Sequence, residues 1–471
     1  MELPPLTLDR TAERPLAVQL ADALRAATAG GALRAGDRLP STRALAATLG
    51  ISRTVTAAAY DQLLAEGWVA ARRGAGTYVQ HTPPRARCST ATSPQPDAGP
   101  VAVRQPDRPA GVDLRAGTPC LDALDRAAWR RAWRAAADPP PDLAPDPVGL
   151  PAFRGAVVEH LLRHRGLPAD PDTVLATAGS TAAVAELART FPAGARVGVE
   201  EPGYQRAVSA LRAAGCAVVP LPVDAAGLVV DAVPPGLAAV YCTPAHQYPL
   251  GARLSAARRV ALVERARAEG FVVVEDDYDG ELRYDVAPLP LLAALGPDVV
   301  VHLGTASKLL TPTLGVGWLV APPAVREAVL ANRAATGCRP ATAGQRVFAA
   351  LAAHGDLPRH LRRLRRELSG RRAAVVAALG AAGVPVRGDE AGAHVVVELS
   401  DGAAEQTAIE GAARRGVLLD GLARHHAGPP STAGIVLGYA GPQRADLLHA
   451  LAVVAAPPWM QGGREARGGW I

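Results

Sequence analysis

Lysine is almost absent from this sequence. Of the 50 basic residues among 471, 49 are arginine and one is lysine, Lys308. Most surface sites accept either residue because both carry one positive charge. A site that needs a deprotonatable primary amine cannot accept arginine, since the guanidinium group stays protonated. Lys308 is therefore a candidate for covalent amine chemistry, and the alternative is a surface lysine that was retained by chance.

Long apolar runs and clustered cysteines are also missing. No stretch of about eighteen apolar residues occurs and no charged stretch followed by an apolar one starts the chain, so we expect no membrane span, no secretory signal and a cytoplasmic location. Without a C-x-x-C pair or a flanking pair of histidines, the cysteines predict neither a zinc site nor a disulfide framework, and we expect no bound metal. The five cysteines are Cys88, Cys120, Cys216, Cys242 and Cys338.

The first 80 residues predict a small DNA-binding fold. Apolar residues with helical spacing between 16 and 27 indicate a first helix, which Gly30 stops. Ser41 caps a second helix that ends at Gly50, and Ser52 caps a third. Two helices joined by a three-residue turn are typical of a helix-turn-helix. Two short strands around a basic, glycine-containing tip at 72–76 then predict a wing.

The composition changes abruptly after this segment. Residues 81–112 contain seven prolines and no sustained apolar period, which predicts a linker with about 3 Å of reach per residue. From 113 onward, short β-branched runs alternate with helical stretches, which predicts βαβ units and a mostly parallel sheet covered by helices on both faces. A smaller α/β part is expected after Arg371. The predicted domains are 1–80, 81–112 and 113–471.

Lys308 follows one of the predicted strands, in the segment Gly304–Lys308. Ligands bind beyond the carboxyl ends of the strands in such sheets, and a lysine there can form an imine with an aldehyde cofactor. Asp276 and Tyr278 follow another apolar strand and can face the same side of the extended chain. Pyridoxal phosphate needs a carboxylate beside its ring nitrogen and gains from a phenol beside its ring oxygen. Taken alone, these two residues would equally fit a solvated acidic strand end.

Two further strand ends fit the same ligand. The segment Thr177–Thr181 joins a strand to a helix, so helix amides and hydroxyl groups can hold a phosphate. Tyr204 ends another strand and presents a ring that could stack on a pyridine, although a lone tyrosine there is more often a packing residue. The predicted phosphate-binding residues are Gly179, Ser180, Thr181, Thr305 and Ser307.

Several motifs along nearly the whole chain resemble the MocR subfamily of GntR-type transcription regulators. That family joins a winged helix-turn-helix to a fold-type I, pyridoxal-phosphate-dependent aminotransferase-like domain. The motifs are Gly36–Arg43, Ser52–Val55, Gly74–Val79, Glu201–Tyr204, Thr243–Gly251, Glu275–Asp279 and Gly304–Lys308. The resemblance implies that Lys308 is the Schiff-base lysine, that Asp276 meets the pyridine nitrogen, that Tyr278 meets the ring oxygen and that Tyr204 stacks on the ring. It also implies a homodimer with shared cofactor sites.

Two positions depart from the family pattern. Gly315 stands where the family usually has an arginine that pairs with the cofactor phosphate, and Val436 stands where an arginine usually binds the carboxylate of the substrate or effector. Arg206 or Arg424 could replace the second arginine, and for each the alternative is an ordinary surface arginine. Both departures put cofactor affinity and amino-acid recognition in question.

Operator contacts are expected from the predicted helix-turn-helix and wing. Arginines at helix starts and in a wing can reach phosphates or base edges of a double-stranded DNA operator. In a chain this rich in arginine, each of them could equally be a solvated charge. The predicted DNA-binding residues are Arg43, Ser52, Arg53, Thr54, Arg72, Arg73 and Gly74.

Three hypotheses follow from the sequence. The first is a DNA-binding regulator whose second domain senses a small amine or amino acid through pyridoxal phosphate. The second is a working aminotransferase with a DNA-binding appendage, which the two missing arginines disfavour. The third is a regulator whose large domain has lost its cofactor, which the retained Lys308 disfavours.

Overall fold

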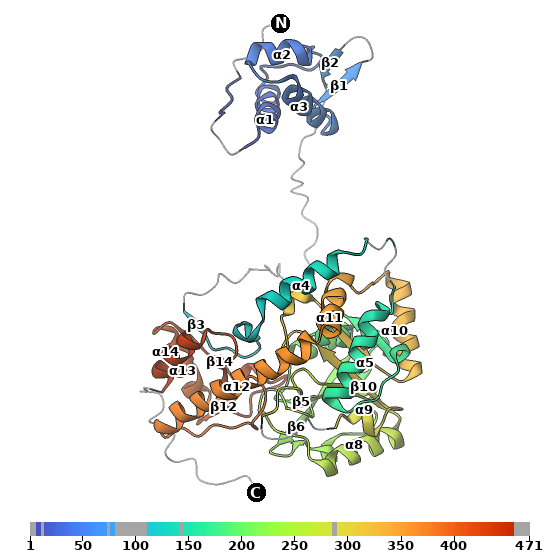
Figure 1. Ribbon diagram of the computed structural model, residues 1–471, viewed down its shortest axis with the longest axis vertical. Helices are drawn as coiled ribbons and strands as arrows, with labels where there is room; N and C mark the ends of the chain where they lie inside the picture. The colour runs from blue at the N-terminus through green and yellow to red at the C-terminus, as the bar shows by residue number, and fades with distance from the viewer. Residues whose placement is uncertain are drawn as a thin grey trace. The chain divides into compact units, whose positions relative to one another are not determined.

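The computed structural model describes residues 6–10, 14–72, 76–80, 111–140, 143, 146–284 and 290–455. The chain divides into two compact units, Met1–Gln105 and Pro106–Ile471 (Figure 1). Arg73, Gly74 and the predicted linker up to residue 110 lie outside the described residues, as does the side chain of Arg72. Within the described part, no helix is both long enough and apolar enough to cross a membrane.

The first unit consists of three helices and a hairpin. Ser41 accepts a hydrogen bond from the amide of Ala44 at 3.1 Å and Ser52 accepts one from Val55 at 3.2 Å, so both helices of the helix-turn-helix have capped N-termini. Gly50 ends the first of them in the left-handed conformation, with φ of 62°. The elements are α1 (Leu16–Ala29), α2 (Thr42–Leu49), α3 (Arg53–Ala65), β1 (Val69–Arg72) and β2 (Gly76–Val79).

A compact apolar core fixes these helices. Leu20 and Leu24 of α1 pack with Leu45 of α2 and Leu63 of α3, and all four are buried. The strands β1 and β2 pair antiparallel with Val69 opposite Val79. This is the winged helix-turn-helix that the sequence predicts.

An eight-stranded sheet forms the centre of the second unit, in the order β4-β11-β10-β9-β8-β5-β6-β7. Strands β10, β9, β8, β5 and β6 run parallel, whereas β11 pairs antiparallel with both β10 and β4. The strands are β4 (Val174–Thr177), β5 (Arg196–Glu201), β6 (Ala217–Asp224), β7 (Gly227–Leu228), β8 (Ala239–Cys242), β9 (Val272–Asp276), β10 (Val300–Thr305) and β11 (Gly317–Val320).

Helices cover both faces of this sheet (Figure 1). One face packs against α6 (Ser180–Ala188), α7 (Gln205–Ala213) and α10 (Pro323–Thr336). The other packs against α5 (Pro151–Arg165), α8 (Ala256–Glu269), α9 (Leu292–Leu295), α11 (Thr342–Ala353) and α12 (Asp356–Ala381). Because side chains alternate along a strand, burial of both faces explains why these strands are nearly continuous apolar runs.

The smaller part has its own three-stranded sheet, in the order β12-β15-β14. The predicted boundary at Arg371 falls inside the 26-residue helix α12, so one helix runs from the large part into the small one. Val112, predicted to end the linker, instead begins β3 and pairs with Val417. The remaining elements are β3 (Val112–Asp113), α4 (Arg126–Ala137), β12 (His394–Leu399), α13 (Gly402–Ala413), β13 (Val417–Leu418), β14 (Asp420–Gly421), β15 (Ala433–Gly438) and α14 (Arg444–Val454).

The predicted fold class is confirmed. The second unit is an α/β fold with a mostly parallel sheet, helices on both faces and a smaller α/β part. Strands β10, β9 and β8 end at the same edge of the sheet because they run parallel. Side chains that follow these strands are therefore brought together.

Candidate functional site

Lys308 lies just beyond the end of β10. Its Nζ donates a hydrogen bond to the carbonyl oxygen of Gly117, a residue 191 positions earlier in the chain. Gly117 has φ of 111°, and a Cβ atom at this position would lie 3.5 Å from that Nζ. Burial lowers the pKa of the Lys308 ammonium group and the charge of Arg206 lowers it further, whereas the nearby aspartates raise it.

Asp276 is the last residue of the neighbouring strand β9. Its Oδ2 accepts a hydrogen bond from the hydroxyl of Tyr241 at 2.6 Å. Its Oδ1 is buried and has no hydrogen-bond partner among the described residues. Burial raises the pKa of Asp276 to about 6, while the hydrogen bond from Tyr241 and the nearby hydroxyl of Ser180 act in the opposite direction. The carboxylate thus has one free acceptor in a buried position.

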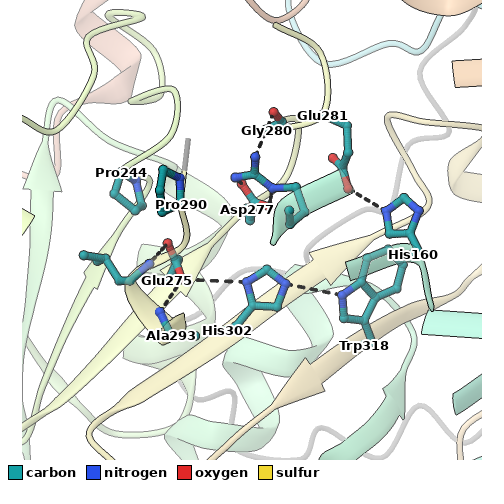
Figure 2. A network of polar contacts seen from close by, with 12 residues as sticks. His160, Pro244, Glu275, Asp277, Gly280, Glu281, Pro290, Ala293, His302 and Trp318 are labelled. Atoms are coloured by element: carbon teal, nitrogen blue, oxygen red, sulfur yellow. Dashed lines mark hydrogen bonds and ion pairs between the residues drawn. The ribbon is translucent and has the colours of Figure 1, made fainter. Parts of the chain in front are cut away.

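The two acidic residues next to Asp276 in the sequence form hydrogen bonds with other parts of the unit. Glu275 accepts hydrogen bonds from the amides of Leu292 and Ala293 at 2.7 and 3.1 Å. Asp277 accepts two hydrogen bonds from the buried guanidinium group of Arg165, at 2.6 and 2.8 Å. Figure 2 shows both acids within a larger network of polar contacts. These contacts hold the strand end in place. Of the three consecutive acids Glu275, Asp276 and Asp277, Asp276 is the one with a buried oxygen that has no partner among the described residues, and Oδ1 of Asp279 is in the same state.

Tyr278 contacts a histidine and a second carboxylate. Its hydroxyl lies 3.1 Å from Nδ1 of His246, and the same Nδ1 lies 2.9 Å from Oδ2 of Asp279. A Cβ atom at Gly392 would come within 2.2 Å of the His246 ring. The small part of the unit therefore packs directly on the histidine that contacts Tyr278, and glycine is required for that approach.

The predicted phosphate-binding residues come together at the start of α6. Gly179 precedes this helix with φ of 118°, and a Cβ atom there would lie 3.5 Å from Oγ1 of Thr305 and 3.9 Å from Oγ of Ser307. The Thr305 hydroxyl donates to Ser307 at 2.9 Å. Helix amides and hydroxyl groups in this arrangement can bind an anion. We call this group, with Ser180, the hydroxyl cradle.

An aromatic group lies beside the cradle. The hydroxyls of Tyr204 and Thr181 are hydrogen-bonded at 3.0 Å, which places both predicted residues together. The Tyr204 ring meets Tyr248 edge to face, with 5.8 Å between centroids. Tyr248 also lies 6.0 Å from Tyr278 and 5.3 Å from His394. Burial lowers the pKa of His394 to about 3, so this imidazole is neutral near pH 7.

The two positions that depart from the family pattern lack a cation. Val436 is fully buried in β15 and packs with Val396 and Leu422. Gly315 has φ of 57° and no heavy atom within 4 Å of a Cβ built on it. Arg424, one candidate replacement, is paired with Asp420. Arg206, the other candidate, has an exposed side chain near the start of α7, and its positive charge lowers the pKa of Lys308.

The predicted DNA-binding residues that the structure describes lie on one helix-turn-helix. Arg43 is the second residue of α2 and Arg53 is the first of α3, and both side chains are exposed. Ser52 caps α3, and Thr54 is exposed in its first turn. A cation at a helix N-terminus is unfavourable for the helix dipole, so helix stability does not explain Arg53.

Sequence reasoning gave no role to several residues of the site. Tyr241 and Gly117 stand alone in the sequence, and nothing near them signals that they contact Asp276 and Lys308. His246 and Tyr248 belong to the motif Thr243–Gly251, which was the available signal. In the described residues, no group of three or more His, Cys, Asp or Glu side chains could hold a metal ion.

Comparisons with known proteins agree with this architecture. Residues 16–79 match the family of bacterial regulatory proteins, gntR family, and residues 109–436 match aminotransferase class I and II. The Pyrococcus horikoshii kynurenine aminotransferase superposes with a TM-score of 0.68 at 26% identity, over 74% of this chain and 90% of that chain. The fold-type I family to which this neighbour belongs depends on pyridoxal phosphate.

Full-length relatives are transcription regulators. The HTH-type pyridoxine biosynthesis transcriptional regulator PdxR of Corynebacterium glutamicum is 35% identical over 460 residues, 96% of this chain and 98% of that protein. The probable rhizopine catabolism regulatory protein MocR of Rhizobium meliloti is 33% identical over 93% of this chain and 92% of its own length. The chain therefore belongs to the MocR subfamily of GntR-type regulators, DNA-binding transcription regulators that carry an aminotransferase-like domain.

Proposed function

We propose that the second unit binds pyridoxal phosphate covalently through Lys308 and that a small amine or amino-acid effector controls DNA binding by competing for that bond. The observation that carries this proposal is the buried, unpartnered Oδ1 of Asp276 beside the strand end that presents the chain's single lysine. An unpaired carboxylate oxygen in a buried position is costly unless a ligand completes it.

The residues present fit the cofactor. The hydroxyl cradle at the start of α6 suits a phosphate, Asp276 suits a protonated ring nitrogen, and Tyr278 suits a ring oxygen. Tyr204 contributes an aromatic face beside the cradle. When bound, pyridoxal phosphate supplies an aldehyde that exchanges primary amines and a ring that withdraws electrons.

Each side chain has a physical task at this site. Burial lowers the pKa of Lys308, which increases the fraction of neutral amine able to act as a nucleophile. The Gly117 carbonyl accepts a hydrogen bond from this amine and so orients it. His246, held by Asp279, contacts the Tyr278 hydroxyl and can hold or release a proton there.

The absence of a cation at positions 315 and 436 favours a sensor over an enzyme. Without a guanidinium group at Gly315, helix amides and hydroxyls alone would hold the phosphate. Val436 offers an apolar surface where a carboxylate would need a donor. An amine could therefore react without the fixed orientation that proton transfer requires. The alternative, a working aminotransferase with a DNA-binding head, is favoured only by the retention of Lys308, Asp276 and Tyr278.

Control of DNA binding requires two states that differ in effector affinity. The packing of Gly392 on His246 couples the small part of the unit to the site. A change in occupancy at Lys308 can thus bias the position of the small part. We also propose that the protein acts as a homodimer, which light scattering of the purified protein would measure.

One experiment separates the sensor from the enzyme. The holoprotein is mixed with a panel of amines and amino acids, with and without a keto-acid acceptor, while the absorbance of the bound cofactor and the release of keto acid are followed. We expect spectral exchange and altered DNA affinity with some amines but no sustained turnover. Turnover of about one per second or faster, which is typical of enzymes, would contradict the sensor.

A further inference from the structure

The helices α4 and α12 lie side by side on the second unit (Figure 1). Arg131 of α4 pairs with Asp356 at the start of α12 at 3.0 Å, and Arg363 of α12 lies 3.6 Å from Asp125, the cap of α4. The two helices therefore run antiparallel and are joined by these two ion pairs, while α4 packs mainly on α11.

Arginines without acidic partners occupy the exposed sides of these two helices. All five side chains named below are exposed, and none forms an ion pair or hydrogen bond with another residue in the described part of the chain. Neither the twelve residues of α4 nor the segment 357–366 of α12 contains an acidic residue. We call the set the α4–α12 arginine face: Arg126, Arg130, Arg134, Arg362 and Arg366.

Helix stability does not account for this pattern. Arg126, Arg130 and Arg134 are spaced by four residues, as are Arg362 and Arg366, so like charges are neighbours on each helix surface. Each such pair costs about 0.2–0.5 kcal/mol in an isolated helix. Arg126 is also the first residue of α4, where the helix dipole disfavours a cation. An arrangement that is unfavourable for the isolated protein points to an anionic partner.

The charge of this surface suits a polyanion. All five cations carry the same sign and neither helix segment contributes an acid to balance them, although the exposed Trp133 of α4 lies among them. Arg126 and Arg134 are eight residues apart, or about 12 Å along a helix. Duplex DNA carries about one negative charge per 1.7 Å of its axis, so several phosphates fall within that length.

Duplex DNA is a polyanion that the first unit of this chain is expected to bind. The first unit, here called the head, belongs to a family that binds DNA, and the second unit is part of the same polypeptide chain. Tethering of this kind raises the effective concentration of a second, weaker contact.

We propose that the α4–α12 arginine face binds phosphates of duplex DNA that flanks the segment held by the head. The contact is independent of base sequence because exposed guanidinium groups meet the phosphate backbone and not the base edges. It extends the length of DNA that one chain covers, and it goes beyond the DNA binding attributed to the helix-turn-helix.

The test compares two lengths of DNA with the full-length protein. Labelled mixed-sequence duplexes of about 20 and 60 base pairs, roughly 70 and 200 Å long, are titrated in fluorescence anisotropy at several salt concentrations. The face variant carries Arg126→Ala, Arg130→Ala and Arg134→Ala. A control with the same change of charge carries Arg189→Ala, Arg196→Ala and Arg414→Ala, three exposed arginines elsewhere on the second unit. Arg196 donates to the Pro235 carbonyl and Arg414 pairs with Glu410, so thermal unfolding of this control is measured as well. Arg126→Lys, Arg130→Lys and Arg134→Lys together preserve the charge.

We expect the wild type to bind the long duplex more tightly than the short one. The ratio of the two affinities should exceed the ratio of the numbers of binding positions on the two duplexes. The face variant should lose this excess, by about tenfold, and its log–log salt slope on long DNA should fall by up to about three. The control and the lysine variant should keep both. Arg53→Ala should weaken both lengths equally, which distinguishes failure of the head from failure of the face.

Three results would overturn the proposal. One is an unchanged length preference in the face variant, and another is an equal loss in the face variant and its control. The third is a change of oligomeric state in the face variant, measured by light scattering, which would make this face a contact between copies of the chain.

Discussion

The head and the candidate cofactor site of the second unit use charge in opposite ways. In the head, Arg43 and Arg53 are exposed and unpaired among the described residues, so they are free to meet a large external polyanion. In the second unit, Asp276 is buried and bonded to Tyr241, and Lys308 is partly buried against Gly117. We therefore expect substitutions in the head to change DNA binding alone. Substitutions in the site should change cofactor binding and the free energy of unfolding together.

The largest effect is expected at Lys308. Lys308→Ala should abolish the near-visible absorbance of the covalently bound cofactor, because no other lysine exists in the chain to replace it. Absorbance of protein mixed with pyridoxal phosphate and then desalted gives the measurement. A band of wild-type intensity in the variant would mean that the α-amino terminus or free cofactor had been detected.

A buried acid should make the stability of the second unit depend on pH. Because burial raises the pKa of Asp276 to about 6 in the folded protein, the folded state binds a proton more tightly than the unfolded state does. This contribution to the free energy of unfolding therefore falls as pH rises from about 4 to above 6, by about 3 kcal/mol in total.

Asp276→Asn should remove that dependence. In urea unfolding of the cofactor-free protein, the variant should gain stability relative to the wild type between pH 4 and pH 7. The variant can also differ from the wild type by an amount that is the same at every pH, because the amide can lose a hydrogen bond. The prediction therefore concerns the change in this difference between pH 4 and pH 7. A difference that does not vary with pH would show that Asp276 titrates as it does in water.

An arginine introduced at position 315 should strengthen binding of the cofactor phosphate. Gly315→Arg should raise affinity for pyridoxal phosphate by about ten- to a hundredfold, since a charge-assisted pair contributes roughly 1.5–3 kcal/mol. Gly337→Arg is the matched control, because that glycine has φ of 67° and similarly open surroundings. Equilibrium dialysis gives both affinities. If the two variants bind the cofactor equally, the phosphate does not lie near position 315.

The smallest effect is expected at the head. Arg53→Ala should weaken operator binding by about 1–3 kcal/mol and leave the unfolding free energy within about 0.5 kcal/mol, because its side chain is exposed. A salt titration of DNA affinity and thermal unfolding check the two parts. Arg34→Ala, an exposed arginine outside α2 and α3, is the control. Unchanged affinity would remove Arg53 from the interface, and lost stability would break the comparison between the units.

Local signals sufficed for most elements. Ser41, Ser52 and Gly50 fix the ends of α2 and α3 through contacts within a few residues, so a reader of the sequence can place them. Short β-branched runs at 173–177, 196–199, 216–221, 239–242, 271–275 and 299–303 predict six strands, which correspond to β4, β5, β6, β8, β9 and β10. Strand β11 was missed because its four residues, Gly317–Val320, include a glycine and only one β-branched residue.

The candidate site divides in the same way. Asp276, Tyr278 and Lys308 could be selected because each follows an apolar strand and carries a reactive group. Tyr241 could not, because a tyrosine inside a buried strand is indistinguishable from a packing residue until its partner is known. Gly117 and Gly392 could not either, since each matters only through contact with a distant side chain.

The sequence by itself determined the head, the α/β character of the second unit and the position of the single lysine, because these depend on local capping, periodicity and composition. Only the tertiary structure decided which buried oxygen of Asp276 stays free, which glycines admit Lys308 and His246, and which arginines remain unpaired on α4 and α12. The physical reason is range: hydrogen bonds and burial are set by neighbours in space, and those neighbours lie tens to hundreds of residues apart in the chain.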